Sequence, residues 1–579
     1  MFIRLMKCGK NRSKVLLVEG YRDQFGKSKQ RRLKDYGYYD ELTKDNPDIM
    51  EKLQVEAKKL SEKAKAQIVS VMLSNTQPNC GSEKFQWYST EIISAIYESL
   101  GLNDLCKRRN NMSNYRYDLD EALRLFVFGR LLDPASKLST LEMATDILPD
   151  CHLSEDDIYH SLDEICEISQ KAQRRIYKRI REIYGLDMTV IFYDVTNYYF
   201  ETDTGDEFRK RGASKENRKD NPLVAMGLLL NSDGSPVAYG IFPGNTHDSK
   251  TLEPTIAHLK KEYSVGRVII VADKGINAKD NFLSLLDKGD GYIVSEKVRG
   301  ASADLKAWVT DESDWIKDTD GRKYKTKLRT RTVVTTHNST KRQVAISERL
   351  IVVYSEKYRE RDRARRAQVV DYLQQYIDNP ARYNAALHKG SKKYLDVHEV
   401  DIATGEIDKG TTTLITINES KLAEDTALDG FYCIVTSETD MAVPEVLERY
   451  AGLWRIEESF RVIKSELKGR PIFVRNESHI RAHFLICFIA LVIGRIIQRR
   501  CGFSLCAEQV LDALRSARCH HLGNGLYHIE PQTKELRTVF SAFDTELDKT
   551  NASITDIREF GRKAKTSALV WENTTEIVR

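Results

Sequence analysis

The chain lacks the sequence features of a secreted or membrane-spanning protein. Its ten cysteines include no Cys-x-x-Cys pair, and a chain of this length does not need disulfides to hold a core, so we expect reduced thiols. The N-terminal sequence MFIRLMKCGK has no apolar stretch of the kind found in a secretion signal. The most apolar run, Phe484 to Ile493, is much shorter than the roughly 20 residues that span a bilayer. We therefore expect a cytoplasmic protein without membrane association and interpret this run as a buried helix.

A strong excess of charge of one sign is also missing. The 90 Lys and Arg residues nearly balance the 85 Asp and Glu residues, which leaves a net charge of +5, and so weak a global field steers no charged partner. Any nucleic-acid signal must therefore be local, and residues 1–40 contain eleven Lys or Arg against four acids. This pattern fits the solvated surface of a small β unit as well as it fits a phosphate-binding one.

Changes in hydrophobic periodicity divide the chain into segments. Strand-like alternation at the N-terminus gives way to helical periodicity and then to strands that alternate with helices. A chain of 579 residues exceeds what one core usually serves, so several domains are expected. We predict a small basic β unit at 1–45, a helical linker at 46–82, a helical domain at 83–185, an α/β domain at 186–299 and 430–500 with a mostly β domain inserted at 300–429, and a C-terminal region at 501–579.

The α/β domain has the most informative order of elements. The predicted elements are a strand at 189–193 that ends at Asp194, hairpin strands at 223–230 and 237–242, a helix at 249–262, and a strand at 267–272 that ends at Asp273. Three strands, a helix and a strand is the opening order of a ribonuclease-H-like fold. A helix at 444–468 and the buried helix at 480–499 are predicted to follow the insertion.

Asp194 and Asp273 are candidates for a metal site. Carboxylates at the ends of neighbouring strands, with a third from a later helix, are what two-metal phosphoryl transfer requires, because Mg²⁺ prefers oxygen ligands and keeps several waters. Two ions about 3.5–4 Å apart activate the attacking oxygen and stabilise the leaving oxygen without a protein nucleophile. An acid that closes an apolar strand is also often an ordinary loop residue, so each residue taken alone leaves both interpretations open.

The third acid is expected on the helix that contains the sequence WRIEESFRVIK. Its apolar residues recur at i, i+4, i+7 and i+11, which is the stripe of a half-buried helix. At about 100° per residue, Glu457 falls on the flank beside this stripe, whereas Glu458 points almost opposite the core and should face solvent. Tyr450, Arg461 and Lys464 share the flank with Glu457. A metal ligand must border the core to reach the strand ends, so this geometry selects Glu457.

The spacing on this helix resembles that of a known enzyme family. Tyr450, Glu457 and Lys464 match the Tyr-x2-Arg-x3-Glu-x6-Lys signature of the Asp-Asp-Glu (DDE) transposases of bacterial insertion sequences, in the branch with a β-rich insertion before the catalytic Glu. Leu453 departs from the signature at the Arg position. The missing charge could come from one of three nearby residues, Arg449, Arg455 or Arg461.

The two strand-end acids extend the resemblance. The sequences YDVTNYYFE around Asp194 and VADKG around Asp273 are similar to the first and second acid motifs of the same family. The order of elements from roughly 187 to 499, more than half of the chain, is similar as well. The resemblance implies a ribonuclease-H-like catalytic domain in which Asp194, Asp273 and Glu457 bind two Mg²⁺ or Mn²⁺ ions.

The resemblance also implies an activity and partners. The metal-bound site would cut DNA at the ends of the element to free a 3′-hydroxyl, which then attacks target DNA. By the same analogy Tyr450 and Lys464 contact phosphates near the cut end. The implied partners are the terminal inverted repeats and the target DNA, bound by a homodimer in the nucleoid-associated cytoplasm.

Further basic residues are candidates for DNA contacts. The segment 208–221 carries six Lys or Arg beside the first acid and resembles a loop of the family, although it is also compatible with a solvated polar loop. The residues of this segment that we expect to contact DNA are Lys210, Arg211, Lys215, Arg218 and Lys219. We expect Arg461, on the helix that carries Glu457, to contact DNA as well. The helix with the sequence ERDRARRAQ could hold DNA likewise or form an exposed charged face. The helical domain and the N-terminal unit are assigned to repeat recognition by position only, because no helix-turn-helix signature is clear.

Two other functions remain open from the sequence. The first is a ribonuclease-H-like nuclease that hydrolyses DNA but joins nothing, since hydrolysis and strand transfer use the same three acids. The second is a DNA-binding regulator descended from a transposase, with catalysis lost. The insertion and the Tyr-Glu-Lys spacing favour transposition over the first, and the presence of all three acids in the right order argues against the second.

Overall fold

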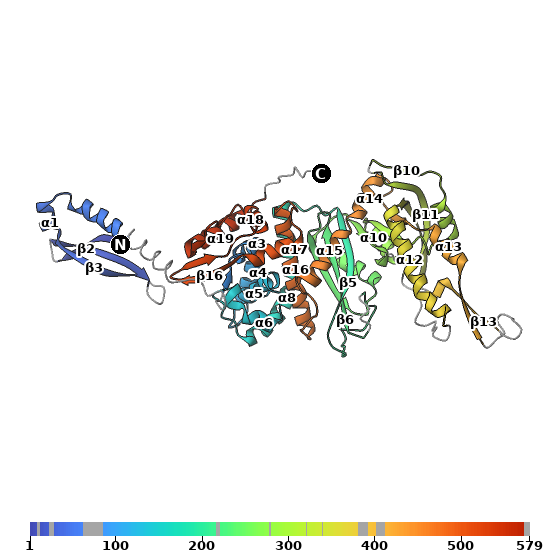
Figure 1. Ribbon diagram of the computed structural model, residues 1–579, viewed down its shortest axis with the longest axis horizontal. Helices are drawn as coiled ribbons and strands as arrows, with labels where there is room; N and C mark the ends of the chain where they lie inside the picture. The colour runs from blue at the N-terminus through green and yellow to red at the C-terminus, as the bar shows by residue number, and fades with distance from the viewer. Residues whose placement is uncertain are drawn as a thin grey trace. The chain divides into compact units, whose positions relative to one another are not determined.

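The chain forms two compact units, one from residues 1–84 with 520–526 and one from residues 85–519 with 527–579. A computed structural model describes residues 1–8, 12–22, 28–61, 85–215, 220–276, 279–319, 321–337, 340–379, 392–400 and 412–571. Figure 1 labels the elements along the chain. The candidate catalytic residues all belong to the second unit.

The first unit contains an antiparallel sheet of order β1-β2-β3 (Phe2–Cys8, Arg12–Arg22, Ser28–Tyr38), followed by α1 (Tyr39–Asp45) and a helical stretch at 49–61. The run from Val15 to Val18 is buried and supplies its centre. Several basic side chains of this unit are paired with carboxylates: Arg12 with Asp40 and Glu41, Lys14 with Asp35, and Arg31 with Glu19. Part of the local positive charge is therefore neutralised within the unit.

The second unit begins with helices. They are α3 (Thr90–Ser99), α4 (Leu102–Asn110), α5 (Leu119–Leu132), α6 (Lys137–Glu142), α7 (Ala144–Ile147) and α8 (Glu155–Tyr184). α5 ends just before Pro134, because the residue that precedes a proline cannot easily continue a helix. α8 begins with a capping box between Ser154 and Asp157 and ends at Gly185, whose φ of 62° is the left-handed conformation that glycine adopts readily.

A nine-stranded sheet forms the centre of the second unit, in the order β10-β11-β12-β15-β9-β8-β5-β6-β7. The strands from β5 to β9 are Val190–Tyr199, Leu223–Asn231, Pro236–Pro243, Ile269–Ala272 and Gly291–Glu296, with α9 (Leu252–Tyr263) before β8 and α10 (Lys279–Asp287) before β9. β5 pairs antiparallel with β6 and parallel with β8. This is the predicted order of three strands, a helix and a strand, and it is consistent with a ribonuclease-H-like fold.

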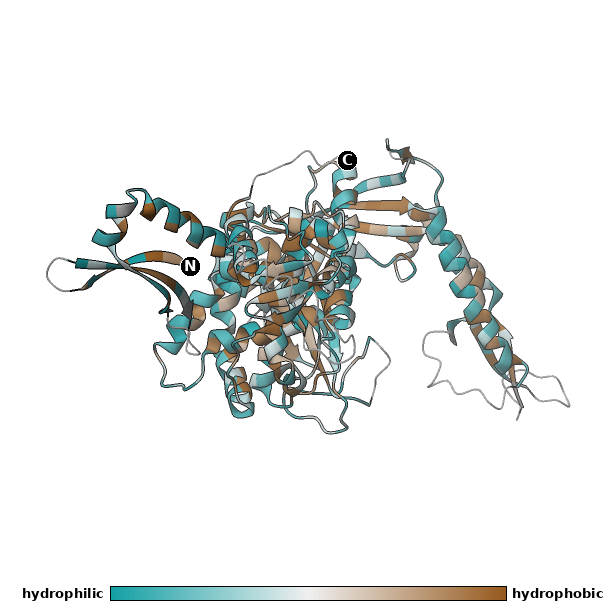
Figure 2. Cartoon of the chain, turned by 60° about the vertical axis from the view of Figure 1, so that its left-hand side comes forward, coloured by the Kyte–Doolittle hydropathy of each residue, from teal (hydrophilic) through white to brown (hydrophobic). Residues whose placement is uncertain are grey.

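The two faces of the sheet pack into different cores. Along β5, Phe192 belongs to the core shared with the helices α3, α5, α8 and α16, whereas its neighbours Ile191 and Tyr193 belong to the core shared with α9 and α10. Successive strand residues point to opposite faces, so helices cover the sheet on both sides. Figure 2 shows hydrophobic residues concentrated in these central elements.

The segment at 300–429 is not a separate β domain throughout. After α11 (Ala303–Thr310), the strands β10 (Ile316–Lys317), β11 (Lys323–His337) and β12 (Thr340–Tyr354) continue the central sheet, because β12 pairs with β15 (Phe431–Thr436) and β15 pairs with β9. Later described elements of the segment, α12 (Glu356–Ile377), β13 (Leu395–Val400), β14 (Thr412–Ile417) and α13 (Glu419–Ala427), lie outside this sheet, and a small core around Leu373 and Ile415 joins some of them. Strand periodicity alone does not tell which sheet a strand joins.

The predicted helix at 444–468 is three elements. α14 (Val443–Ala451) and α15 (Trp454–Arg461) are separated at Gly452, and a π-helical turn, η5 (Val462–Glu466), follows. A Cβ atom on Gly452 would lie 2.4 Å from Cζ of Phe192, so the break lets the backbone approach β5 where no side chain fits. This close approach sets α15 against the strand that carries Asp194.

The last part of the unit begins with α16 (Glu477–Arg500), which packs against α5 and α8. Among the described helices, α16 is the one long and apolar enough to cross a membrane, but 89% of its apolar window is buried, as expected for a core helix. The remaining elements are α17 (Ala507–Ser516), β16 (Arg518–Gly523), β17 (Leu526–Ile529), α18 (Lys534–Ser541), β18 (Asn551–Ser553) and α19 (Ile554–Ala568), and the sheet order is β18-β17-β16-β4, with β4 at Phe85–Trp87.

Candidate active site

Asp194 and Asp273 lie at the same level of two neighbouring strands. The parallel pairing of β5 with β8 ends at the pair Tyr193 and Ala272, and each acid is the next residue on its strand's path. β5 does not end at Asp194 as the sequence predicted; it continues to Tyr199 because β6 pairs with it along its whole length. Asp194 is therefore held in a strand and Asp273 lies just beyond one.

Both aspartates and Glu457 line one cavity of about 850 Å³. The acids come from β5, from the turn after β8 and from α15, so residues distant in sequence meet at one opening. In the described part of the chain, no three Asp, Glu, His or Cys side chains are grouped closely enough to enclose a metal ion. The cavity thus gathers the three carboxylates without closing them into a finished coordination shell.

A fourth acid and a lysine complete the surroundings of Asp194. Lys215 Nζ lies 3.7 Å from Asp194 Oδ1 and 3.3 Å from Asp248 Oδ2, and it also donates to the backbone carbonyl of Val195. Burial raises the pKa of Asp194 to about 6; the charges of Asp248 and Asp273 act in the same direction and Lys215 acts against them. The Lys215 ammonium thus lies between the carboxylates of Asp194 and Asp248. Carboxylate oxygens are the hard ligands that Mg²⁺ prefers, so these residues fit a divalent ion.

Sequence reasoning did not find Asp248. It lies in η1 (Asp248–Lys250), just before α9, and does not follow an apolar strand. The signal that could have found it is the short polar run THDSK between a predicted hairpin and a predicted helix. Only the fold brings this turn next to β5.

Asp273 is held from the neighbouring strand. Ser295 on β9 donates a hydrogen bond to Asp273 Oδ1 over 2.7 Å. Tyr450 on α14 lines the same cavity. Burial raises the pKa of Tyr450, a hydrogen bond with Ser295 lowers it, and the charge of Asp273 raises it. The structure therefore places Tyr450 beside the second acid.

The two glutamates of α15 have different environments. Glu457 is exposed and faces the cavity. Glu458 was expected to face solvent, but it pairs with Arg495 of α16 over 2.9 Å. The helical stripe marks one buried side only, and α16 covers a second side of α15 that the stripe does not mark.

Lys464 and Arg461 also have different environments. Lys464 Nζ donates to Thr196 Oγ1 over 2.7 Å, two residues along β5 from Asp194, and burial lowers its pKa to about 8, with Lys215 acting in the same direction. Arg461 is half exposed and lies 3.6 Å from Glu466. Lys464 thus borders the first acid, whereas Arg461 faces outward.

The basic loop at 208–221 is only partly directed outward. Lys210 pairs with Glu207 over 3.0 Å, and Arg211 donates to the carbonyl of Asp203 over 3.1 Å. The Lys215 ammonium lies beside Asp194 and Asp248. Arg218 and Lys219 fall outside the described residues. Lys210 and Arg211 are therefore the described members of the loop that remain near its surface.

Arginines from other elements face the acids across the cavity. Arg361 and Arg365 of α12, on the same helical face as Tyr358, line the cavity together with Arg299. Arg299 is partly neutralised, because it lies 2.7 Å from Asp429 and 3.2 Å from Asp362. Leu453, which replaces the signature arginine, also lines the cavity, and the positive charge there comes from Arg299, from α12 and from Lys274 and Lys297.

Of the three arginines that could have replaced the signature charge, none lines the cavity. Arg449 pairs with Glu445 over 2.6 Å. Arg455 packs close to Gly234 in the hairpin between β6 and β7. Arg461 pairs with Glu466 as described. None of the three therefore stands in for the signature arginine at the cavity.

Comparison with known proteins gives a family for this fold and site. No curated protein matches the chain. Two solved structures show weak likeness: a piggyBac transposase synaptic complex with hairpin DNA, at 8% identity and a TM-score of 0.35 over 84% of each chain, and a Mos1 transposase paired-end complex with the left transposon end, at 13% identity and a TM-score of 0.14 over 31% of this chain and 59% of that one. The model of the transposase DDE domain matches residues 185–493. Because this match covers more than half of the chain, the protein belongs to the DDE transposase family.

Proposed function

We propose that this transposase binds the terminal inverted repeats of a bacterial insertion sequence, cuts the DNA at its ends and joins the freed 3′-hydroxyls to target DNA. The observation that supports this most directly is the cavity of about 850 Å³ that is lined both by Asp194, Asp273 and Glu457 and by arginines. The acids suit a phosphoryl-transfer centre and the arginines suit the DNA that must lie across it.

The family generally uses divalent metal ions. Asp194, Asp273 and Glu457 would hold two Mg²⁺ or Mn²⁺ ions, which supply Lewis acidity at the attacking and leaving oxygens. With a pKa of about 6, the Asp194 carboxyl is mostly ionised near neutral pH and is therefore available as a ligand. The Lys215 ammonium, which lies beside Asp194 and Asp248, would compete with a divalent ion for the Asp194 carboxylate.

Residues in and beside the cavity would orient DNA. Lys464, anchored on Thr196, has its ammonium beside the first acid and would bind a phosphate next to the scissile one. Tyr450 would pack against the same DNA strand, at the part of the cavity where Asp273 lies. Arg361 and Arg365 are exposed and one helical turn apart, which matches the spacing needed to hold successive phosphates of one strand.

We also propose that two copies of the chain act together in the DNA complex, because two transposon ends must be brought together, and that the protein acts in the cytoplasm at the nucleoid. The N-terminal unit and the helices α3 to α8 are the proposed site of repeat recognition, with the catalytic cavity contacting mostly backbone.

One experiment separates the proposed function from its rivals. A duplex that carries one end of the encoding element is incubated with the protein, Mg²⁺ and a supercoiled target plasmid, and cleaved and joined products are measured separately. Joined products support transposition. Cleavage without joining identifies a nuclease, and binding without cleavage identifies a regulator.

A further inference from the structure

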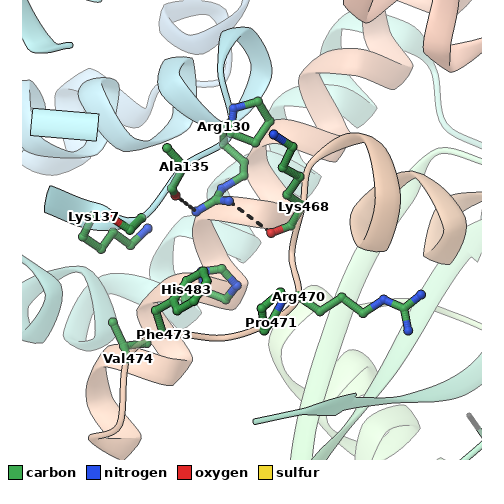
Figure 3. A pocket seen from close by; sticks show the side chains of 11 residues that line it. Arg130, Ala135, Lys137, Lys468, Arg470, Pro471, Phe473, Val474 and His483 are labelled. Carbon is green, nitrogen blue, oxygen red and sulfur yellow. Dashed lines mark hydrogen bonds between the residues drawn. The ribbon is translucent and has the colours of Figure 1, made fainter. Parts of the chain in front are cut away.

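A second cavity, of about 180 Å³, lies between the α5–α6 connection and the segment that links η5 to α16 (Figure 3). Its basic lining residues are Arg130, Lys137, Lys468, Arg470 and His483. No carboxylate of the described residues lines it. The cavity therefore differs from the catalytic one, where acids and bases face each other.

Lys137 is buried in this cavity without a counter-charge. Its side chain is 7% exposed, and its ammonium lies 4.5 Å from the centre of the Phe126 ring. No ion pair joins it to a carboxylate in the part of the chain that the structure describes. Burial lowers the pKa of Lys137 well below its ordinary value, and the nearby charge of Arg130 lowers it further. Without an anion this buried amine favours its neutral form, and an anion that joins it stabilises the ammonium.

Arg130 adds a second buried cation. Its Nη1 donates to the carbonyls of Leu467 and Lys468 and its Nη2 to that of Ala135, each over 3.2 Å, and Figure 3 shows this guanidinium between the two segments. Its Nε has no hydrogen-bond partner among the described residues. Carbonyls are neutral, so these bonds orient the guanidinium without cancelling its charge.

His483 contributes no further charge. Burial lowers its pKa well below the ordinary value, and its Nε2 lies 3.1 Å from the carbonyl of Gly469. A neutral ring that donates to this carbonyl fixes the segment that forms the cavity wall. The unbalanced charge therefore comes from Arg130 and Lys137.

The mouth of the cavity leads toward the catalytic strand. Lys468 is exposed and lies four residues after Lys464, whose ammonium is anchored on Thr196. Arg470 points away from the cavity in Figure 3, and its guanidinium is 6.0 Å from the ring of Tyr199 at the end of β5. A line of positive charge thus connects β5 with the cavity.

We propose that this cavity binds a backbone phosphate of the DNA strand that passes the three acids. The proposal rests on the proposed function, because it takes DNA as the ligand. The phosphate would lie between Lys137 and Arg130, with Lys468 at the mouth and the 69%-exposed Phe473 against the sugar or base. A free phosphate has the same chemistry, but the basic residues that continue toward β5 favour a polymer that spans both places.

The test replaces the buried ammonium by an apolar group of similar length, in Lys137→Met. The binding of the full chain to a duplex with one end of the encoding element is measured at several salt concentrations. We expect binding to weaken roughly tenfold and the slope of log K against log salt to become shallower by about 1, as for the loss of one phosphate contact. The thermal midpoint should stay equal or rise, because a buried unpaired charge is removed.

Two further variants guard against an effect of folding. Lys468→Gln changes only an exposed side chain at the mouth and should also flatten the salt slope. Lys534→Met, at the exposed start of α18, removes an equal charge outside both the cavity and the helices proposed to recognise the repeats, and should leave affinity and slope unchanged. Wild-type affinity and slope in both Lys137→Met and Lys468→Gln would overturn the proposal.

Inorganic phosphate separates the two sources of the ligand. At constant ionic strength, phosphate that raises the thermal midpoint of the wild type but not of Lys137→Met, while DNA binding is the same in both, overturns the DNA assignment in favour of free phosphate. If the wild type itself does not bind the duplex, the proposed function fails, whereas the loss of DNA affinity in Lys137→Met with wild-type binding intact supports the cavity as a phosphate site.

Discussion

The two cavities of the second unit differ in how their charged side chains are paired. At the larger one, Lys215 is shared between Asp194 and Asp248 and Arg299 between Asp362 and Asp429, so charges of both signs lie close together. In the smaller one, Lys137 and Arg130 are buried together and no described carboxylate lines the walls. Balanced charge suits a site that exchanges ions and substrates, whereas unbalanced buried charge suits a site whose ligand supplies the missing sign.

The largest expected effect comes from the acidic wall of the larger cavity. Asp194→Asn should reduce cleavage of the end duplex in Mg²⁺ by at least about a thousandfold, since it removes a ligand that supports several kcal/mol of transition-state stabilisation. Its affinity for the duplex should not fall, because one negative charge near the DNA is lost. Gel-based cleavage and binding assays measure both. Cleavage at the wild-type rate would exclude Asp194 from the metal site.

The basic wall of the same cavity should affect binding more than chemistry. Arg361→Ala combined with Arg365→Ala should flatten the salt slope of DNA binding by about 1.8, the value for two lost phosphate contacts. Arg363→Ala is the matched control, because this exposed arginine lies on the same helix but does not line the cavity. Equal effects of Arg363→Ala and Arg365→Ala would contradict a directed arginine face.

Within the smaller cavity, Arg130 should behave unlike Lys137. Arg130→Met leaves three carbonyls without their donor, so it should destabilise the folded protein by about 2–4 kcal/mol, whereas Lys137→Met should not. Thermal unfolding of the two variants side by side makes the measurement. If both lose the same stability, Lys137 has a packing role and the contrast between the two cations disappears.

The smallest effect is expected at a carboxylate outside both cavities. Hydrogen bonds from Lys549 and Ser553 lower the pKa of Asp556, in the capping box of α19, to about 2. Its stabilisation is therefore complete above the unfolded pKa of about 3.9 and is lost as the pH falls through about 2. Asp556→Asn should cost about 1 kcal/mol at pH 7 and less at pH 3, as thermal midpoints at the two pH values would show. An equal cost at both would contradict the lowered pKa.

Local sequence patterns predicted the elements that carry the first two acids. The apolar runs before Asp194 and Asp273 were predicted to be strands. These strands, β5 and β8, are neighbours in the sheet and pair in parallel. The apolar run at 484–493 was correctly interpreted as a buried helix, because α16 packs within the unit. These features follow from periodicity within one segment.

Features that depend on contacts between distant segments were not predictable in this way. The approach of Gly452 to Phe192 breaks the helix at 444–468, the ion pair with Arg495 draws Glu458 away from solvent, and the turn at Asp248 reaches Asp194 only through the fold. The continuation of the central sheet by β11 and β12 likewise depends on β15, which lies after the segment at 300–429 in sequence.

That continuation sets the width of the larger cavity. Asp273 follows β8, and α12 begins just after β12; between β8 and β12 stand only β9 and β15. Three strand spacings of about 4.8 Å separate the two strands by about 14 Å, and the backbone hydrogen bonds of a sheet do not stretch. The second acid and the arginine helix are therefore mounted on a single frame, so the distance between them is set by the sheet and not by a hinge.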